Sequence, residues 1–165
     1  MAEYRQFAWM SHEELERRAR CDIPWRYYLN TEVYIVAPDC HGTVRPVVSE
    51  TGGVDPPLGS LHVITAIQPD ADPLTAESRA RLQVLDAELR AARIASIPAV
   101  GSSVGGGHSE ESRAVFGIDD AAARELGLKF GQVAVFSWSG PMWSLLACAS
   151  TRQDHRAWRW VEGHG

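Results

Sequence analysis

Apolar residues gather along the chain in short runs, which turn-forming stretches rich in glycine, proline and polar residues separate. β-Branched, aromatic and other apolar residues fill five of these runs, as is typical of strands. The predicted strands cover residues 31–37, 61–66, 95–100, 132–138 and 142–150. The last two flank Ser139-Gly140-Pro141, which predicts a hairpin. A further strand at 44–48 contains Pro46, which would confine it to a sheet edge or a bulge.

Helical spacing is clearest between residues 73 and 93, where Leu82, Leu85 and Leu89 share one face. Asp72 followed by proline is a typical start for this helix. A capping-box pattern at Ser11 predicts a second helix to about residue 20, with so few apolar positions that we expect it to be a solvated surface helix. Two short helices are predicted after Ser109 and after Asp119.

Strands near both ends with helices between them favour the α+β class, with a single mixed or antiparallel sheet and helices packed on it. A doubly wound dinucleotide fold would need regular strand–helix alternation, which this pattern lacks. A length of 165 residues fits one domain, residues 1–165. We divide it into an N-terminal helical extension (1–30), a core (31–150) and a tail (151–165).

Composition is that of a globular protein, with 45% hydrophobic and 22% charged residues. The formal net charge of -5 argues against nucleic acid and anionic membranes as partners. No run approaches the roughly 20 apolar residues of a spanning helix, and the charged N-terminal stretch is unlike a secretory signal. The three cysteines are distant from one another, which favours reduced thiols and a cytoplasmic location.

The stretch 101–112 is the first candidate for chemistry, because a glycine-rich loop there precedes a predicted helix. It departs from the phosphate-binding loop pattern, with Gly107 in place of the lysine and His108 in place of Ser/Thr. One interpretation points Glu111 or Glu110 into a pocket as a general base, with His108 beside it. The other is that both glutamates only stabilise the first turn of a helix. Sequence leaves both open.

Metal and nucleophile patterns are weak. The six histidines include no HxxxH pair and the cysteines include no CxxC, so we predict no metal site and no cofactor. Neither a GxSxG elbow nor an HExxH motif occurs.

Four segments follow one another in an order and spacing that resemble a known family. They are Leu61-His-Val-Ile-Thr-Ala-Ile-Gln-Pro69, the Arg/Leu helix, Glu111-Ser112, and Phe130-Gly-Gln-Val-Ala-Val-Phe136. Over about residues 31–140 the chain resembles the uncharacterised bacterial family DUF3293. The family has Trp-Asn-Pro at 67–69, an asparagine near residue 78 and an aromatic residue near residue 108, where this chain differs. The resemblance implies no activity, but it singles out Gln68, Glu111, Ser112 and Gln132 as polar residues in matching segments.

Because strand ends and helix starts tend to meet at one edge of a sheet, these side chains predict a polar pocket that binds a small metabolite. Glu111 is the predicted catalytic residue of any acid–base chemistry, and the predicted ligand-binding residues are Gln68, His108, Ser112 and Gln132. Whether the protein is an enzyme stays undecided. The alternatives are a non-catalytic interaction or regulatory module using Trp-rich surfaces, and a nucleotide-processing enzyme. A small molecule, a protein or a second copy of the chain are the expected partners.

Overall fold

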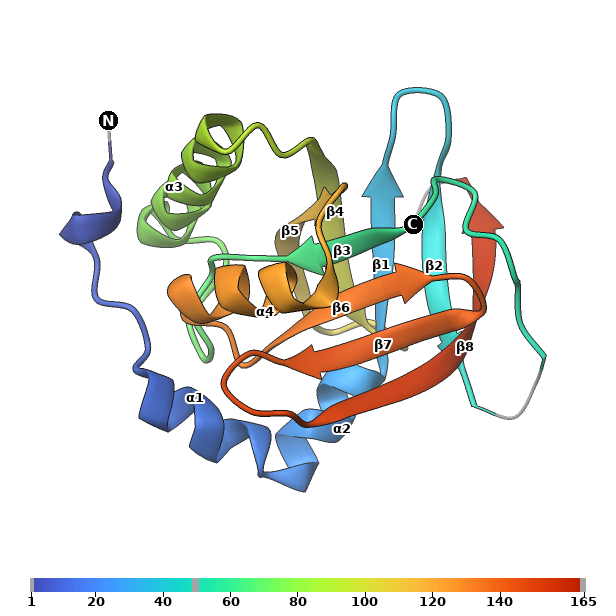
Figure 1. Cartoon of the computed structure of the whole chain (residues 1–165), viewed down its shortest axis with the longest axis horizontal. Helices are drawn as coiled ribbons and strands as arrows, with labels where there is room; N and C mark the ends of the chain where they lie inside the picture. Colours follow the sequence, from blue (N-terminus) through green and yellow to red (C-terminus); the bar gives the residue numbers. More distant parts are fainter. Residues whose placement is uncertain (1, 49–50, 164–165) are drawn as a thin grey trace.

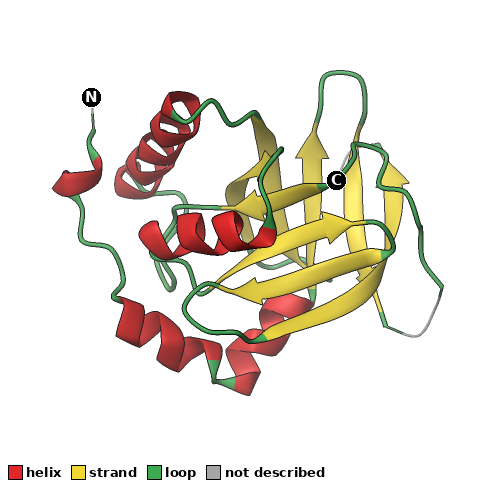
Figure 2. Cartoon of the chain, in the orientation of Figure 1, coloured by secondary structure: helices red, strands yellow, loops and turns green. Residues whose placement is uncertain are grey.

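Eight antiparallel strands close into a barrel (Figures 1 and 2). The computed structural model describes residues 2–48 and 51–163. Around the barrel the order is β1-β2-β8-β7-β6-β3-β5-β4, and β4 pairs back onto β1. The strands are β1 (Thr31–Val36), β2 (His41–Val47), β3 (Leu61–Ile64), β4 (Ser96–Ser103), β5 (Ser109–Val115), β6 (Ala134–Ser139), β7 (Met142–Ala147) and β8 (Gln153–Glu162).

Helices cover part of the barrel wall and one of its ends. The helices are the 3-10 helix η1 (Tyr4–Gln6) and the α-helices α1 (His12–Ala19), α2 (Asp22–Leu29), α3 (Ala76–Ala91) and α4 (Asp120–Lys129). In Figure 1, α3 and α4 lie beside the barrel, and α1 and α2 run along one end of it. None of the helices described has the length and apolar character that a membrane span needs.

The predicted open sheet with helices packed on it is therefore wrong, because the sheet closes on itself. Two segments expected to be something else complete the ring. The tail, 151–165, contributes β8, which pairs with β2 on one side and β7 on the other. The segment after Ser109, predicted as a helix, is β5, which joins β3 to β4. The ends of the predicted domain, residues 1, 164 and 165, lie outside the described residues.

Both segments alternate between the two sides of the barrel wall, as the two-residue period of a strand requires. In β8, Trp158 and Trp160 pack with the interior cluster, whereas Arg159 and Val161 between and after them are exposed. The strand β2 pairs with β1 and with β8, but the β1 ladder ends at Val44, so at Pro46 the strand is paired on the β8 side alone. Proline is tolerated in a paired strand only where its missing N–H is not needed for the ladder.

The barrel interior is a packed core to which every strand contributes. It contains Val33, Ile35, Val44, Leu61, Val63, Ala99, Ala114, Trp138, Trp143 and Trp158. Trp138 is central, with the ring of Trp158 edge-on at a centroid distance of 4.9 Å. Trp158 also donates its indole N–H to the carbonyl of Gly140 at 2.8 Å. The tryptophans of the tail are thus core residues.

A second cluster lies between α3, α4 and the outer wall, and a third involves α1 and α2. Leu82, Leu85 and Leu89 of α3 are buried in the second cluster, as their spacing predicted. This helix begins after Thr75, whose side chain accepts the Ser78 N–H, and not at Asp72-Pro73. The cap of α1 at Ser11 is confirmed, but this helix is not a solvated appendage: its two apolar side chains, Leu15 and Ala19, are fully buried.

Candidate functional site

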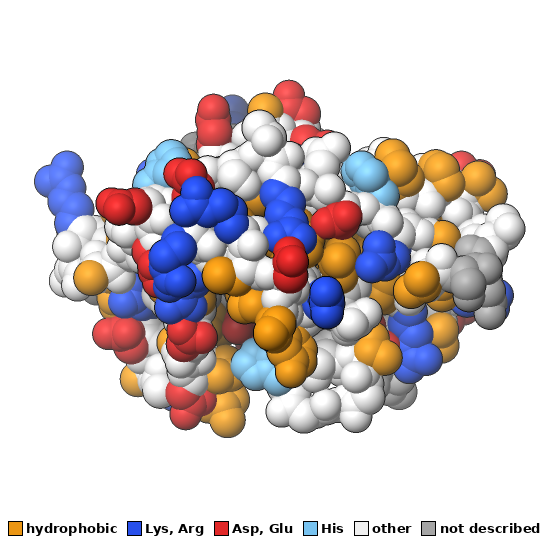
Figure 3. Space-filling model, turned by 90° about the horizontal axis from the view of Figure 1, so that it is seen from below, with side chains coloured by type: hydrophobic (Ala, Val, Ile, Leu, Met, Phe, Trp, Pro, Cys, Tyr) orange, Lys and Arg blue, Asp and Glu red, His pale blue; other side chains and the backbone are white. Residues whose placement is uncertain are grey.

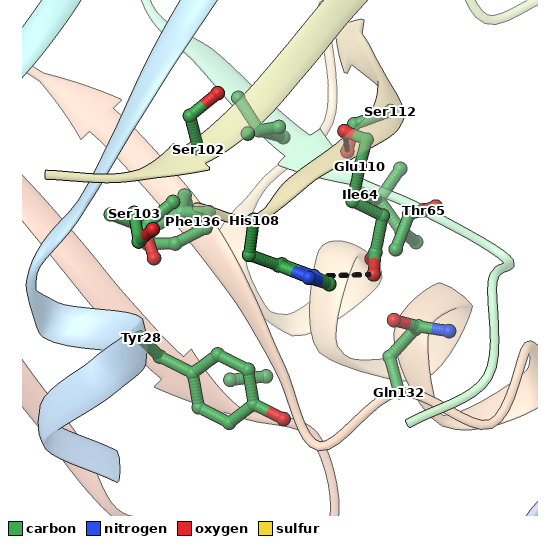
Figure 4. A pocket seen from close by; sticks show the side chains of 14 residues that line it. Tyr28, Ile64, Thr65, Ser102, Ser103, His108, Glu110, Ser112, Gln132 and Phe136 are labelled. Carbon is green, nitrogen blue, oxygen red and sulfur yellow. Dashed lines mark hydrogen bonds and ion pairs between the residues drawn. The ribbon is translucent and has the colours of Figure 1, made fainter. Parts of the chain in front are cut away.

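Two adjoining cavities open at the barrel end where the β4–β5 turn approaches α2. The inner one has a volume of about 110 Å³ and reaches interior side chains such as Val63 and Phe136. The outer one has a volume of about 540 Å³ and extends over the segment 67–73. Both are lined by the same five residues, Tyr28, His108, Glu110, Gln132 and Ala134. We call these five shared residues the junction of the two cavities. Figure 4 shows Tyr28, His108, Glu110 and Gln132 from close by.

Glu110 is the charged centre of this junction. Its position on β5 turns its side chain inward, and 26% of that side chain is exposed. The nearest partner is the His108 ring, with Nε2 3.6 Å from Oε2, a separation just beyond hydrogen-bond distance (Figure 4). Burial removes water from the carboxylate and raises the pKa of Glu110 to about 7. The carboxyl group therefore exchanges its proton near neutral pH.

Tyr28 and Gln132 complete the polar part of the junction. Burial, followed by the negative charge of Glu110, raises the pKa of Tyr28 to about 12, so its hydroxyl keeps its proton. Gln132 donates from Nε2 to the carbonyls of Ile67 and Phe130, both at 3.0 Å. Only the amide nitrogen can make these two bonds, so the amide oxygen lies on the other side. In Figure 4 that oxygen lies toward His108 and Glu110.

Glu111, the predicted catalytic residue, lies on the outer side of the barrel wall. Its side chain is 58% exposed, its carboxylate pairs with Arg113 at 3.4 Å, and it lines neither cavity. The prediction assumed a helix start, where both neighbouring glutamates could face one pocket. In a strand, adjacent side chains point to opposite faces, so only Glu110 enters the site.

Gln68 is also outside both cavities. Its Oε1 accepts the Met10 N–H at 2.8 Å, and its Nε2 donates to the carbonyls of Ala66 and Phe130. These bonds tie the N-terminal segment to the end of β3. Both polar atoms of the Gln68 side chain are therefore bonded within the protein, which gives this residue a structural role.

The three other predicted ligand-binding residues do meet. Ser112 lines the inner cavity, and His108 and Gln132 line both. Sequence reasoning missed Tyr28, because the segment 22–29 was not expected to be helical. The signal was present in the Asp22–Leu29 stretch, where Trp25 and Leu29 are four residues apart and both buried on one face.

The raised pKa of Glu110 predicts how the free energy of unfolding depends on pH. A carboxyl whose folded pKa exceeds its unfolded value contributes stability below about pH 4.5, which is lost as the pH rises through 7. Glu110→Gln removes this penalty, so we expect it to raise the free energy of unfolding by about 2–3 kcal/mol at pH 8 and to have little effect at pH 4.5. Urea unfolding at the two pH values measures it. Glu111→Gln is the control, and an equal gain in both variants at pH 8 would contradict the assignment.

A second polar cluster lies on the outer wall, where His62, Ser137, Ser144 and His155 occupy paired positions on four neighbouring strands. Asp120, the first residue of α4, accepts from His62 at 2.7 Å and from Ser137 at 3.0 Å. Burial raises the pKa of Asp120, but hydrogen bonds from His62 and Ser137 outweigh it, and the pKa is lowered. These groups line a cavity of about 590 Å³.

Ser144 in that cluster has the 2.6 Å contact with His155 Nδ1 that a nucleophilic serine needs. A catalytic histidine also needs a third group that orients it. Among the described residues, His155 Nε2 contacts only the Gln153 amide nitrogen, at 3.5 Å, and no carboxylate is bonded to this ring. The pair therefore lacks the carboxylate of a catalytic triad.

Charges of both signs are distributed over the surface, and the described residues that line the paired cavities include no strongly basic side chain. On the face seen in Figure 3, acidic and basic side chains are interspersed. No lysine or arginine is among the described residues that line the paired cavities. Within residues 2–48 and 51–163, no three His, Cys, Asp or Glu side chains lie close enough to hold a metal ion.

The fold and site define a closed antiparallel barrel with a ligand-sized cavity at its mouth. Over residues 64–135 the chain matches the model of the family described as protein of unknown function (DUF3293), which confirms the resemblance. The match runs from the end of β3 into β6, so it contains Glu110 and Gln132 but not Tyr28. Comparison with the curated proteins and with the solved structures gave no match.

Proposed function

We propose that the protein binds a small metabolite in the paired cavities at the barrel mouth, with Glu110 as the acid–base group of the site. The observation that carries this is the position of Glu110, a carboxyl with a pKa of about 7 at the junction of an apolar chamber and a wider polar one. General acids and bases are most effective when their pKa is close to the working pH. Barrel mouths are also common ligand sites.

The role first assigned to Glu111 passes to its neighbour in this proposal. Two further observations support a metabolite over the alternatives. A nucleotide would need cations for its phosphates, and none lines the cavities among the described residues. An interaction surface built on tryptophan lacks support, because Trp25, Trp138, Trp143 and Trp158 are buried and the other two are partly buried.

Gly101 offers a way to block the inner cavity without disturbing the core. It lines that cavity, and a side chain added there would first meet the Thr31 methyl group at 3.6 Å, an ordinary contact. Gly101→Leu should therefore fold and fill the chamber. In a thermal-shift screen of metabolites, we expect ligands at about 100 times their Kd to raise the wild-type Tm by roughly 5–10 °C and to leave Gly101→Leu unchanged.

Ser96→Leu, exposed near the start of the same strand, is the matched control and should respond as the wild type does. Ligands that stabilise Gly101→Leu as much as the wild type would place binding elsewhere. A wild-type protein that no metabolite stabilises would count against the proposal altogether.

A further inference from the structure

The hydrogen-bonding groups at the junction of the two cavities specify the kind of ligand group that belongs there. Among the described residues, no donor lies within hydrogen-bond distance of the Glu110 carboxylate, and none bonds to the amide oxygen of Gln132. Tyr28 also lines both cavities, and no described residue forms a hydrogen bond with its hydroxyl (Figure 4). A carboxylate and an amide oxygen only accept, whereas the protonated Tyr28 hydroxyl can accept or donate. The junction therefore presents two groups that only accept and a third that can do either.

Withdrawing acceptors from bulk water without giving them a partner is costly, most of all for a carboxylate, and the Glu110 side chain is 26% exposed. The neighbouring charges do not supply what Glu110 lacks. Arg18 on α1 is bonded to Asp70 at 2.6 Å and to Glu14 at 3.1 Å. Asp70 and Asp72, in the loop before α3, line the outer cavity and add acidic groups there. Arg113 on β5 is paired with Asp86 and Glu111, and His108, the basic side chain near Glu110, is largely exposed.

The inner cavity sets the shape of the rest of the ligand. Val63, Ile64 and Phe136 supply apolar surface, and its volume of about 110 Å³ is below the roughly 150 Å³ of a cavity that takes benzene. A short branched aliphatic group fits this space better than an aromatic ring does. A primary ammonium group carries three N–H donors, one for each of the three groups at the junction that can accept.

Resting on the proposed function, we infer that the site binds a primary amine in its ammonium form, with a short branched apolar tail in the inner cavity. Glu110 is the counter-ion of the ammonium group, and Gln132 and Tyr28 accept its other two hydrogen bonds. An anionic metabolite is disfavoured, because its carboxylate or phosphate would meet the Glu110 carboxylate and neither lysine nor arginine among the described lining residues.

Three probes with one carbon skeleton separate the possibilities: 3-methylbutylamine, 3-methylbutan-1-ol and 3-methylbutanoate. Each is titrated into the wild-type protein at pH 8 and followed through the backbone amide signals of Gly101 and Ala134, which line the inner cavity. We expect the amine to shift these signals with a Kd at least about tenfold lower than that of the alcohol, the gain of one charged hydrogen bond. The acid should leave them unchanged.

Glu110→Gln keeps the size of the side chain and removes its charge, so the amine should bind at least about tenfold more weakly and lose its advantage over the alcohol. Glu111→Gln changes the adjacent residue on the outer wall and should bind as the wild type does. Because Glu110 ionises around pH 7, amine affinity should also fall roughly tenfold from pH 8 to pH 6. His108→Gln should keep this pH dependence, which separates the contribution of Glu110 from that of His108.

If the alcohol or the acid binds at Gly101 and Ala134 as tightly as the amine, the ammonium inference is overturned and the pocket stands. If Glu110→Gln binds the amine unchanged, Glu110 is not the counter-ion and the inference is also overturned. If none of the three probes shifts these signals, the inference fails, and the pocket itself is judged by the Gly101→Leu screen.

Discussion

Replacing Trp158 by alanine should lower the free energy of unfolding by about 3–5 kcal/mol, the range for truncation of a buried aromatic side chain. Trp158 is 3% exposed, packs edge-on against Trp138 at the centre of the barrel, and fills the space beside Gly53. Its indole N–H also satisfies the Gly140 carbonyl. The loss therefore combines a cavity, an aromatic pair and a buried hydrogen bond. Urea unfolding followed by far-ultraviolet circular dichroism measures it.

Val161→Ala is the matched control, because it lies on the same strand but is 49% exposed. We expect its effect to stay within about 0.5 kcal/mol, as for surface positions away from special features. If the two substitutions cost the same, β8 would not be part of a closed barrel.

Leu85→Ala should cost about 2–5 kcal/mol, the range for a fully buried leucine. Leu85 is 0% exposed and lies between Leu82 and Leu89 in the cluster that joins α3 and α4 to the outer wall. Removing its side chain leaves a gap between α3 and the barrel wall. The surrounding backbone cannot close that gap completely. The unfolding midpoint in urea reports the change.

Gln83→Ala on the exposed side of α3 is its control and should be close to neutral, since alanine is the better helix former. A Leu85→Ala midpoint equal to that of Gln83→Ala would mean that α3 does not pack on the barrel.

Local pattern was enough to predict most elements but not the closure of the sheet. The α3 stripe of Leu82, Leu85 and Leu89 and the hairpin at Ser139-Gly140-Pro141 depend on neighbours in sequence, and both were predicted. The strand β5 depends on partners far away: Ala114 pairs with Ile97 on β4 and with Val63 on β3. Its polar sequence has weak strand propensity, and tertiary pairing overrides that propensity.

The candidate site shows the same limit on a smaller scale. Three of the predicted ligand-binding residues, His108, Ser112 and Gln132, line the inner cavity. Glu111 does not, because whether Glu110 or Glu111 faces the cavity depends on whether the backbone is helical or extended. Register decides it: Glu111 pairs with Val100 and Glu110 with Gly101, so the residue opposite a cavity-lining glycine is the one that faces inward.

The position of Tyr28 divides the junction of the two cavities into two parts. Glu110 and Gln132 lie within residues 64–135, the stretch that matches the family model, whereas Tyr28 comes from α2. The matched stretch alone therefore does not form the whole junction: its carboxylate and amide come from that stretch, and its tyrosine side comes from the N-terminal segment that lies along the end of the barrel.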